Sequence, residues 1–116
     1  MNSSMNFKIN ATPHFERELK ALAKRYKSMK QDFRTLTDSL KENPFQGTDL
    51  GNGLRKIRMA IKSKGKGKSA GARVITYTVL ADEATGEVWL LEIYDKSEHS
   101  SVKMDVINEL VDKLGL

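Results

Sequence analysis

Residues 54–61 (LRKIRMAI) alternate in the manner of a β-strand, and the two sides of that strand differ in chemistry. One side carries Ile57 and Met59, and the other side carries Lys56 and Arg58. Burying unpaired cations costs several kcal/mol each, so the cationic side cannot lie under an apolar layer. We therefore expect a sheet with one face against the core and one open, basic face.

Two further strand-like runs, residues 72–81 and 87–95, follow with links too short for helical crossovers. Strands joined in this way pair as an antiparallel meander. The run 87–95 (EVWLLEIYD) is strongly apolar and is expected to be the central strand of the sheet. The link at 62–71 is rich in Lys and Gly and is expected to be a flexible basic loop. A fourth strand is predicted at residues 5–10.

Two amphipathic helices are predicted between the strand at 5–10 and the strand at 54–61. Thr12 suits the N-cap of the first and Pro13 its first turn, and a short break is expected around Ser28. The second helix ends before Pro44, because the residue preceding a proline avoids helical geometry. Apolar residues repeating every four positions over 102–114 predict a C-terminal helix.

The predicted element order is β-α-α-β-β-β-α, with residues 43–53 (NPFQGTDLGNG) as a loop. This order indicates an α+β fold with a four-stranded, mainly antiparallel sheet. A helical hairpin would cover one face, and the C-terminal helix would complete a single domain spanning residues 1–116.

Positive charge is concentrated in residues 54–73, which hold eight Lys and Arg and no Asp or Glu. The whole chain has 20 basic and 15 acidic residues, so the remainder carries 12 basic against 15 acidic residues. The net charge of +5 therefore originates in this stretch. A block of positive charge beside a strand predicts a site for a polyanion such as nucleic acid.

Composition excludes several other classes of site. The chain has no Cys, which excludes disulfides, thiol catalysis and Cys-ligated zinc. It has no apolar run long enough to cross a membrane and no apolar leader segment near residue 1, so we expect a cytoplasmic protein. The KGKGKS run is not a phosphate-binding P-loop, because Lys62 occupies the position that requires Gly. No spacing of His, Asp and Glu predicts a metal site, and no cofactor is expected.

The candidate catalytic residues are cations from three neighbouring strands: Lys56, Arg58, Arg73 and Lys96. Several cations around one phosphate can stabilise the extra charge of a pentacoordinate transition state. The alternative is ordinary surface salt bridging with Glu87, Glu92 and Asp95. His99 lies near the same end and is a candidate general acid or base, whereas His14, at a helix start, is expected to be structural.

The candidate residues for binding a nucleic-acid backbone are Lys62, Lys64, Lys66 and Lys68 in the loop, together with Arg55. Glycines between the lysines let backbone N–H groups approach a phosphate closely, and the lysines supply charge. The alternative interpretation is a plain solvated loop. Paired carboxylates are not visible in this region, so phosphodiester chemistry here would be independent of metal ions.

The KIRM strand, the KGKGKSAGAR run and the IYDKSE segment resemble the RelE/HigB-like toxins of bacterial type II toxin–antitoxin systems. The resemblance covers nearly the whole chain and is sharpest over residues 54–98. It implies a ribosome-dependent endoribonuclease that cleaves mRNA by attack of the 2′-hydroxyl group. A cognate antitoxin protein would hold the toxin inactive.

The resemblance also implies roles for single residues. Lys56 and Arg58 match paired basic positions of the family, and Arg73 matches an arginine that stabilises transition-state charge. Lys96 stands where related toxins have an arginine that serves the leaving group. The family's C-terminal tyrosine has no counterpart after Tyr94, which leaves the general base unassigned.

Two other functions remain open at this point. ParE-like members of the same fold inhibit DNA gyrase and cut no RNA, but they generally lack the cations on the strands. A catalytically degenerate module that binds nucleic acid or protein is the second alternative, and the missing tyrosine is its best support.

Overall fold

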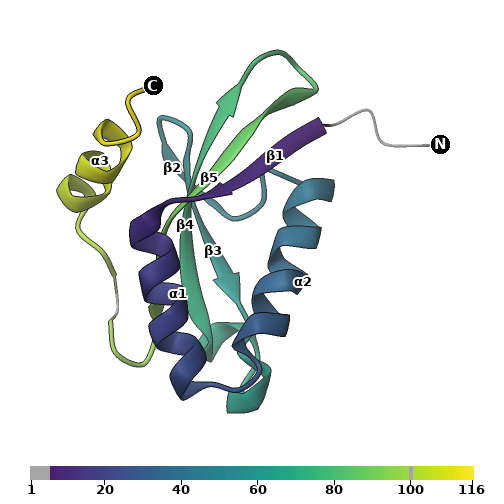
Figure 1. Ribbon diagram of the computed structural model, residues 1–116, viewed down its shortest axis with the longest axis vertical. Helices are drawn as coiled ribbons and strands as arrows, with labels where there is room; N and C mark the ends of the chain where they lie inside the picture. Colours follow the sequence, from purple (N-terminus) through teal and green to yellow (C-terminus); the bar gives the residue numbers. More distant parts are fainter. Residues whose placement is uncertain (1–5, 100) are drawn as a thin grey trace.

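The computed structural model describes residues 6–99 and 101–116, and it forms three helices and one five-stranded mixed sheet (Figure 1). The helices are α1 (Pro13–Arg25), α2 (Met29–Glu42) and α3 (Met104–Asp112). The strands are β1 (Asn6–Ala11), β2 (Thr48–Gly51), β3 (Leu54–Met59), β4 (Ala72–Leu80) and β5 (Thr85–Asp95). No helix of the described chain has the length and apolar character needed to cross a bilayer.

The strands lie in the order β1-β5-β4-β3-β2. The predicted meander is confirmed, because β3, β4 and β5 pair in sequence and antiparallel. β5 has neighbours on both sides, but the middle strand of the five is β4 and not β5, contrary to what the apolar sequence of β5 had indicated. β1 pairs with β5 in parallel, so the sheet is mixed. Met5, the first residue of the strand predicted at 5–10, lies outside the described residues.

The prediction of four strands was wrong, because residues 43–53 are not only a loop. β2 pairs antiparallel with β3 through a tight turn in which Gly51, Asn52 and Gly53 all have positive φ angles. The segment before the turn is short and polar and has few of the residues that favour strands. The sequence signal for this hairpin was the pair Asn52-Gly53, which is typical of a hairpin turn.

The helical hairpin lies on one face of the sheet, as predicted. Thr12 caps α1, because its Oγ1 accepts a hydrogen bond from the Phe15 N–H group at 3.1 Å. The apolar stripes of both helices pack with β1, β3, β4 and β5 into the main core, which includes Phe15, Leu22, Met29, Leu36 and Leu40.

The opposite face is only partly open, contrary to expectation, because α3 covers one end of it (Figure 1). Ile107 of α3 is fully buried against Leu54, Ile75 and Leu91. Leu91 is an extra residue in β5, since Ile75 pairs with Glu92 and the next residue of β4 pairs with Leu90. The bulge adds an apolar side chain beneath α3.

If Ile107 anchors α3, Ile107→Ala should lower the free energy of unfolding by about 2 kcal/mol or more. Val106→Ala is the matched control, because the Val106 side chain on the same helix is exposed. Urea unfolding of both variants measures the difference. Equal stability of the two variants would contradict this packing.

Candidate functional site: a basic cluster on the sheet

Three side chains form a row across the central strands. Arg58 on β3 pairs directly with Arg73 on β4, which pairs with Tyr94 on β5. Directly opposed residues project from the same face of a sheet, so these three side chains leave neighbouring strands on one face. Lys56 is two residues before Arg58 on that face, and Lys96 immediately follows β5. We call Lys56, Arg58, Arg73 and Lys96 the basic cluster.

The basic cluster has no carboxylate partners. Within residues 6–99 and 101–116, ion pairs involve only His14, Arg25 and Lys64 as the basic member. The three acids that would neutralise the cluster are engaged elsewhere: Glu87 with the Trp89 side chain, Glu92 with His14, and Asp95 with Arg25 and Lys64. Ordinary salt bridging, the alternative raised from the sequence, therefore does not account for these four residues in the described chain.

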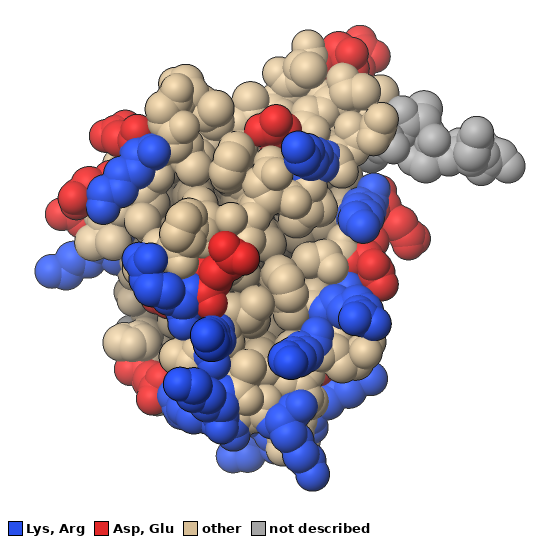
Figure 2. Space-filling model, in the orientation of Figure 1, with Lys and Arg blue, Asp and Glu red and all other residues tan. Residues whose placement is uncertain are grey.

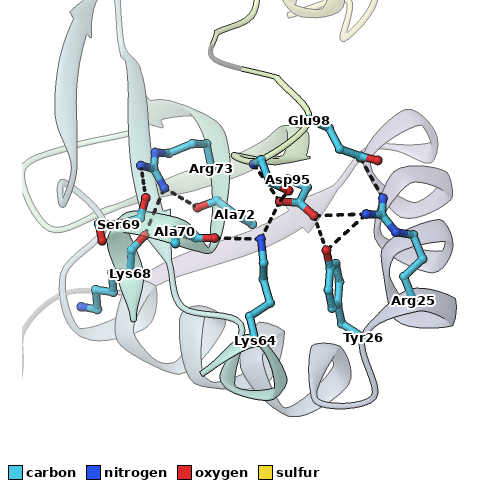
Figure 3. Close-up of polar contacts among 11 residues, drawn as sticks. Arg25, Tyr26, Lys64, Lys68, Ser69, Ala70, Ala72, Arg73, Asp95 and Glu98 are labelled. Atoms are coloured by element: carbon cyan, nitrogen blue, oxygen red, sulfur yellow. Dashed lines mark hydrogen bonds and ion pairs between the residues drawn. The ribbon is translucent and has the colours of Figure 1, made fainter. Parts of the chain in front are cut away.

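Arg73 is buried and is bound by backbone oxygens (Figure 3). One guanidinium nitrogen donates to the carbonyl oxygens of Lys68 and Ala72 at 3.1 and 3.2 Å, and the other donates to that of Ser69 at 2.9 Å. Carbonyl groups satisfy its donors without cancelling its charge. Arg73 therefore shapes the loop and also leaves an uncompensated positive charge beside Arg58.

The loop at 62–71, which its Lys/Gly composition predicts to be flexible, contains regular local structure. It forms two short 3₁₀ turns, η1 (Lys62–Lys64) and η2 (Lys68–Ala70), and returns to the sheet at Gly71. A side chain at Gly71 would lie 2.1 Å from the carbonyl oxygen of Met59, so only glycine fits there. The Gly71 carbonyl accepts a hydrogen bond from the Lys96 N–H group at 3.0 Å, which fixes the end of β5 beside the loop.

The loop lysines fall into two kinds. Lys62, Lys66 and Lys68 are exposed, and basic side chains gather at the lower end of the molecule, where this loop lies (Figures 1 and 2). The Lys64 side chain is only 14% exposed, and its Nζ donates to Asp95 Oδ1 at 2.8 Å and to the carbonyl of Ala70 at 2.9 Å. Lys64, predicted to contact RNA, thus holds the loop to the sheet instead.

Arg55, the remaining predicted RNA-binding residue, is not brought to the basic cluster. It alternates with Lys56 and Arg58 on β3 and so projects from the face that α1 and α2 cover. Its guanidinium group lies 5.2 Å from the centre of the Phe45 ring, a cation–π contact that leaves the residue half-buried.

Asp95 is the point at which helix, loop and sheet meet (Figure 3). Its side chain is fully buried and accepts hydrogen bonds from Lys64, from the Tyr26 hydroxyl and from both the backbone N–H and the hydroxyl of Ser97. Arg25 lies 3.4 Å away. Burial alone would raise the pKa of this carboxyl, but the hydrogen bonds from Lys64, Tyr26 and Ser97 outweigh it and hold the pKa well below its usual range.

A second anchor holds the start of the loop to α2. Asp32 Oδ2 accepts hydrogen bonds from the Ser28 hydroxyl at 2.6 Å and from the Lys62 N–H group at 3.2 Å. Ser28 in turn accepts one from the Ser63 N–H group at 2.9 Å. Sequence reasoning missed this anchor. The available signal was Asp32 itself, a buried acid three residues after Met29 on the apolar side of its helix.

His99 and Tyr94 are two titratable groups near the end of β5. His99 is exposed, and its ring meets that of Tyr94 edge-on, with 6.1 Å between the ring centres. The Tyr94 hydroxyl is buried and, within the described chain, has no hydrogen-bond partner. Burial raises its pKa, and the charge of Arg73 acts in the opposite direction.

Another cluster lies away from the cations. His14 Nε2 is 2.7 Å from Glu92 Oε1 and 3.3 Å from Glu18 Oε1. Burial raises the pKa of the Glu18 carboxyl to about 8, and the nearby Glu92 carboxyl adds to the shift. The sequence predicted no metal site because Glu92 is 78 residues from His14. The only local signal was the four-residue spacing of His14 and Glu18, which places both on one side of α1.

A comparison of the chain with models of known protein families gives no match.

Lys64→Met should lower the free energy of unfolding at neutral pH by about 1.5–3 kcal/mol, because it removes a charged hydrogen bond to a buried carboxylate. The control is Lys66→Met, in which an exposed lysine of the same loop is replaced. That change should stay within about 0.5 kcal/mol of wild type. Chemical denaturation checks both, and equal losses would show that Lys64 is not an anchor.

The comparison of wild type with Lys64→Met also yields a pH prediction. Since the folded-state pKa of Asp95 lies below its unfolded value of about 4, its stabilising contribution is present above that pH and is lost as pH falls through the folded pKa. The difference in unfolding free energy between wild type and Lys64→Met should therefore narrow as the pH is lowered from 5 toward 2. The change should follow the protonation of one carboxyl group. A constant gap would argue against an ionised Asp95.

Proposed function

We propose that this chain is the toxin of a type II toxin–antitoxin system and that it cleaves mRNA on the ribosome. The observation that carries the proposal is the basic cluster, in which four cations on or beside adjacent strands have no carboxylate partner in the described chain. Like charges placed opposite each other, as Arg58 and Arg73 are, destabilise a sheet. Such an arrangement is favourable when an anion binds between them.

The chemistry that suits this cluster is internal transesterification of RNA. The 2′-hydroxyl oxygen attacks the adjacent phosphorus, the bond from phosphorus to the 5′-oxygen breaks, and the attacking hydroxyl's proton is transferred while the leaving oxygen gains one. The products are a 2′,3′-cyclic phosphate and a 5′-hydroxyl end. Lys56, Arg58 and Arg73 would stabilise the pentacoordinate phosphorus, because fixed cations favour the charge that develops there.

The two ends of the site would have different roles. Lys96, exposed at the end of β5, would stabilise the leaving 5′-oxygen, and His99 would transfer protons near neutral pH. Lys62, Lys66 and Lys68 would bind the RNA backbone or ribosomal RNA, since they are exposed and their positions are fixed by the two loop anchors. The partners are then mRNA, the ribosome and an antitoxin protein that covers the basic cluster. The proposal needs no cofactor.

A second candidate is a protein that binds nucleic acid without cutting it. The observation in its favour is the state of Arg73 and Tyr94: the Arg73 guanidinium is occupied by loop carbonyls, and the Tyr94 hydroxyl is buried. Gyrase inhibition, as in ParE-like proteins, is less consistent with the unpartnered strand cations, and a supercoiling assay measures it directly.

The sharpest test of cleavage uses the two exposed members of the cluster. Arg58→Ala combined with Lys96→Ala should leave the fold intact and reduce mRNA cleavage in a translating extract by at least about 100-fold. Expression of this variant should no longer arrest growth. Lys20→Ala combined with Lys24→Ala removes the same charge from the exposed surface of α1 and is the matched control. Arg73 is unsuitable for this purpose, because its loss would also release the loop.

The proposal fails if the wild-type chain cleaves no mRNA in the extract or if both double variants are equally active. Binding without cleavage supports the second candidate instead. In that case RNA affinity should fall by about 0.7 log units per log unit of salt for each phosphate contacted.

A further inference from the structure

The cluster of His14, Glu18 and Glu92 has the composition and geometry of a metal site. His14 and Glu18 lie one turn apart on α1, and Glu92 projects from β5. Each contributes one possible ligand atom, and these atoms all lie within 4.8 Å of one another. An ion at the centre of such a group can reach all three at ordinary bond lengths of about 2.0–2.2 Å after small side-chain adjustments.

The cluster is held in place by the sheet. β1 covers the edge of β5 only as far as Leu90, so the following part of that edge has free N–H groups. Glu18 fills this gap, because its Oε1 accepts a hydrogen bond from the Ile93 N–H group at 3.2 Å. The Glu92 side chain is only 9% exposed. Glu18 and Glu92 are thus restrained by the fold, as the ligands of a preformed site must be.

The cluster brings two carboxyl groups and one imidazole together. Two carboxyl groups converge, and the only basic side chain within ion-pair distance of either, in the described part of the chain, is the imidazole of His14. Arg25 is the nearest cation on α1 that lines the same space, but it pairs with Asp95 and Glu98. A divalent cation would draw both carboxyl groups and the imidazole to one centre.

Beside the cluster is a cavity of about 460 Å³, between α1, the end of β5 and the segment leading to α3. Tyr94 lines this cavity and is 4% exposed, and its buried hydroxyl has no hydrogen-bond partner in the described residues. The cavity has room for a water molecule or small anion that completes the coordination of an ion. The unpartnered hydroxyl is a polar group able to bind such a ligand.

We propose that His14, Glu18 and Glu92 bind a divalent transition-metal ion, with zinc as the preferred ion. Imidazole nitrogen together with carboxylate oxygen is a donor set suited to zinc, whereas magnesium and calcium favour oxygen ligands alone. Three protein ligands leave a fourth position open on the side of the cavity. The ion would join the first turns of α1 to β5. The three ligands are not members of the basic cluster, although Tyr94 and His99 line the same cavity. The proposal does not depend on RNA cleavage.

The test uses the full-length chain without a histidine tag, titrated calorimetrically with zinc chloride and then with magnesium chloride. We expect one zinc ion per chain, much weaker binding of magnesium, and a thermal midpoint that rises with zinc concentration. His14→Ala and Glu92→Gln should each weaken zinc binding by at least about tenfold, the loss seen even when only the supporting residues of a metal site are altered. Glu16→Gln replaces an exposed carboxylate of the same helix and should bind zinc as the wild type does.

Glu18→Gln is a third ligand variant that should keep the fold, because its amide oxygen can still accept the hydrogen bond from the Ile93 N–H group. Its affinity for zinc should nevertheless fall. Cobalt(II) gives an independent spectroscopic measurement. The visible absorption of a bound cobalt ion should appear with wild type and Glu16→Gln and should be weak or absent with the three ligand variants. The proposal is overturned if the wild type binds no zinc, or if zinc binds all the variants equally, which would indicate adventitious surface carboxylates.

Discussion

The buried carboxylate of Asp95 is the interaction on which the arrangement of the candidate site depends. It joins α1 through Arg25 and Tyr26, the basic loop through Lys64, and the turn after β5 through Ser97. An ion pair in the interior is costly unless its remaining hydrogen-bonding capacity is satisfied, and here both carboxylate oxygens have several donors. The network thereby fixes a lysine-rich loop, which would otherwise be mobile, at the open end of the sheet.

The cations near the candidate site fall into two groups: some hold the loop in place, and the others are exposed. Lys64 is neutralised by an acid and Arg73 is bound by neutral carbonyls, and between them they hold the loop. Arg58, Lys96 and the outer loop lysines have no acidic partner in the described chain and remain exposed. The anchored cations thus hold in place the loop that carries the exposed lysines. This division explains how so concentrated a positive charge is compatible with a folded sheet, and it gives the basic cluster the fixed geometry that binding a phosphate requires.

Much of the fold followed from local pattern, because alternation, helical periodicity and capping residues act over a few positions. The meander, both hairpin helices, the Thr12 cap and α3 were predicted in this way. β2 was missed because the strand is short and mostly polar. The parallel pairing of β1 with β5 was missed because it depends on residues distant in sequence. Lys56, Arg58 and Arg73 could be placed together from strand order alone. The burial of Lys64, the Asp32 anchor and the convergence of His14 with Glu92 could not, because each depends on side chains brought together from separate elements.

The central claim is that the basic cluster stabilises attack by a neighbouring 2′-hydroxyl on ribosome-bound mRNA. The chemical identity of the new RNA ends tests this most directly. mRNA recovered from a translating extract containing the wild-type chain should carry a 5′-hydroxyl on each downstream fragment and a cyclic phosphate on each upstream fragment. Enzymatic end-labelling before and after phosphatase treatment distinguishes the two kinds of 5′ end. Fragments with 5′-phosphate ends, or no fragments beyond those of an extract without the protein, would contradict the account.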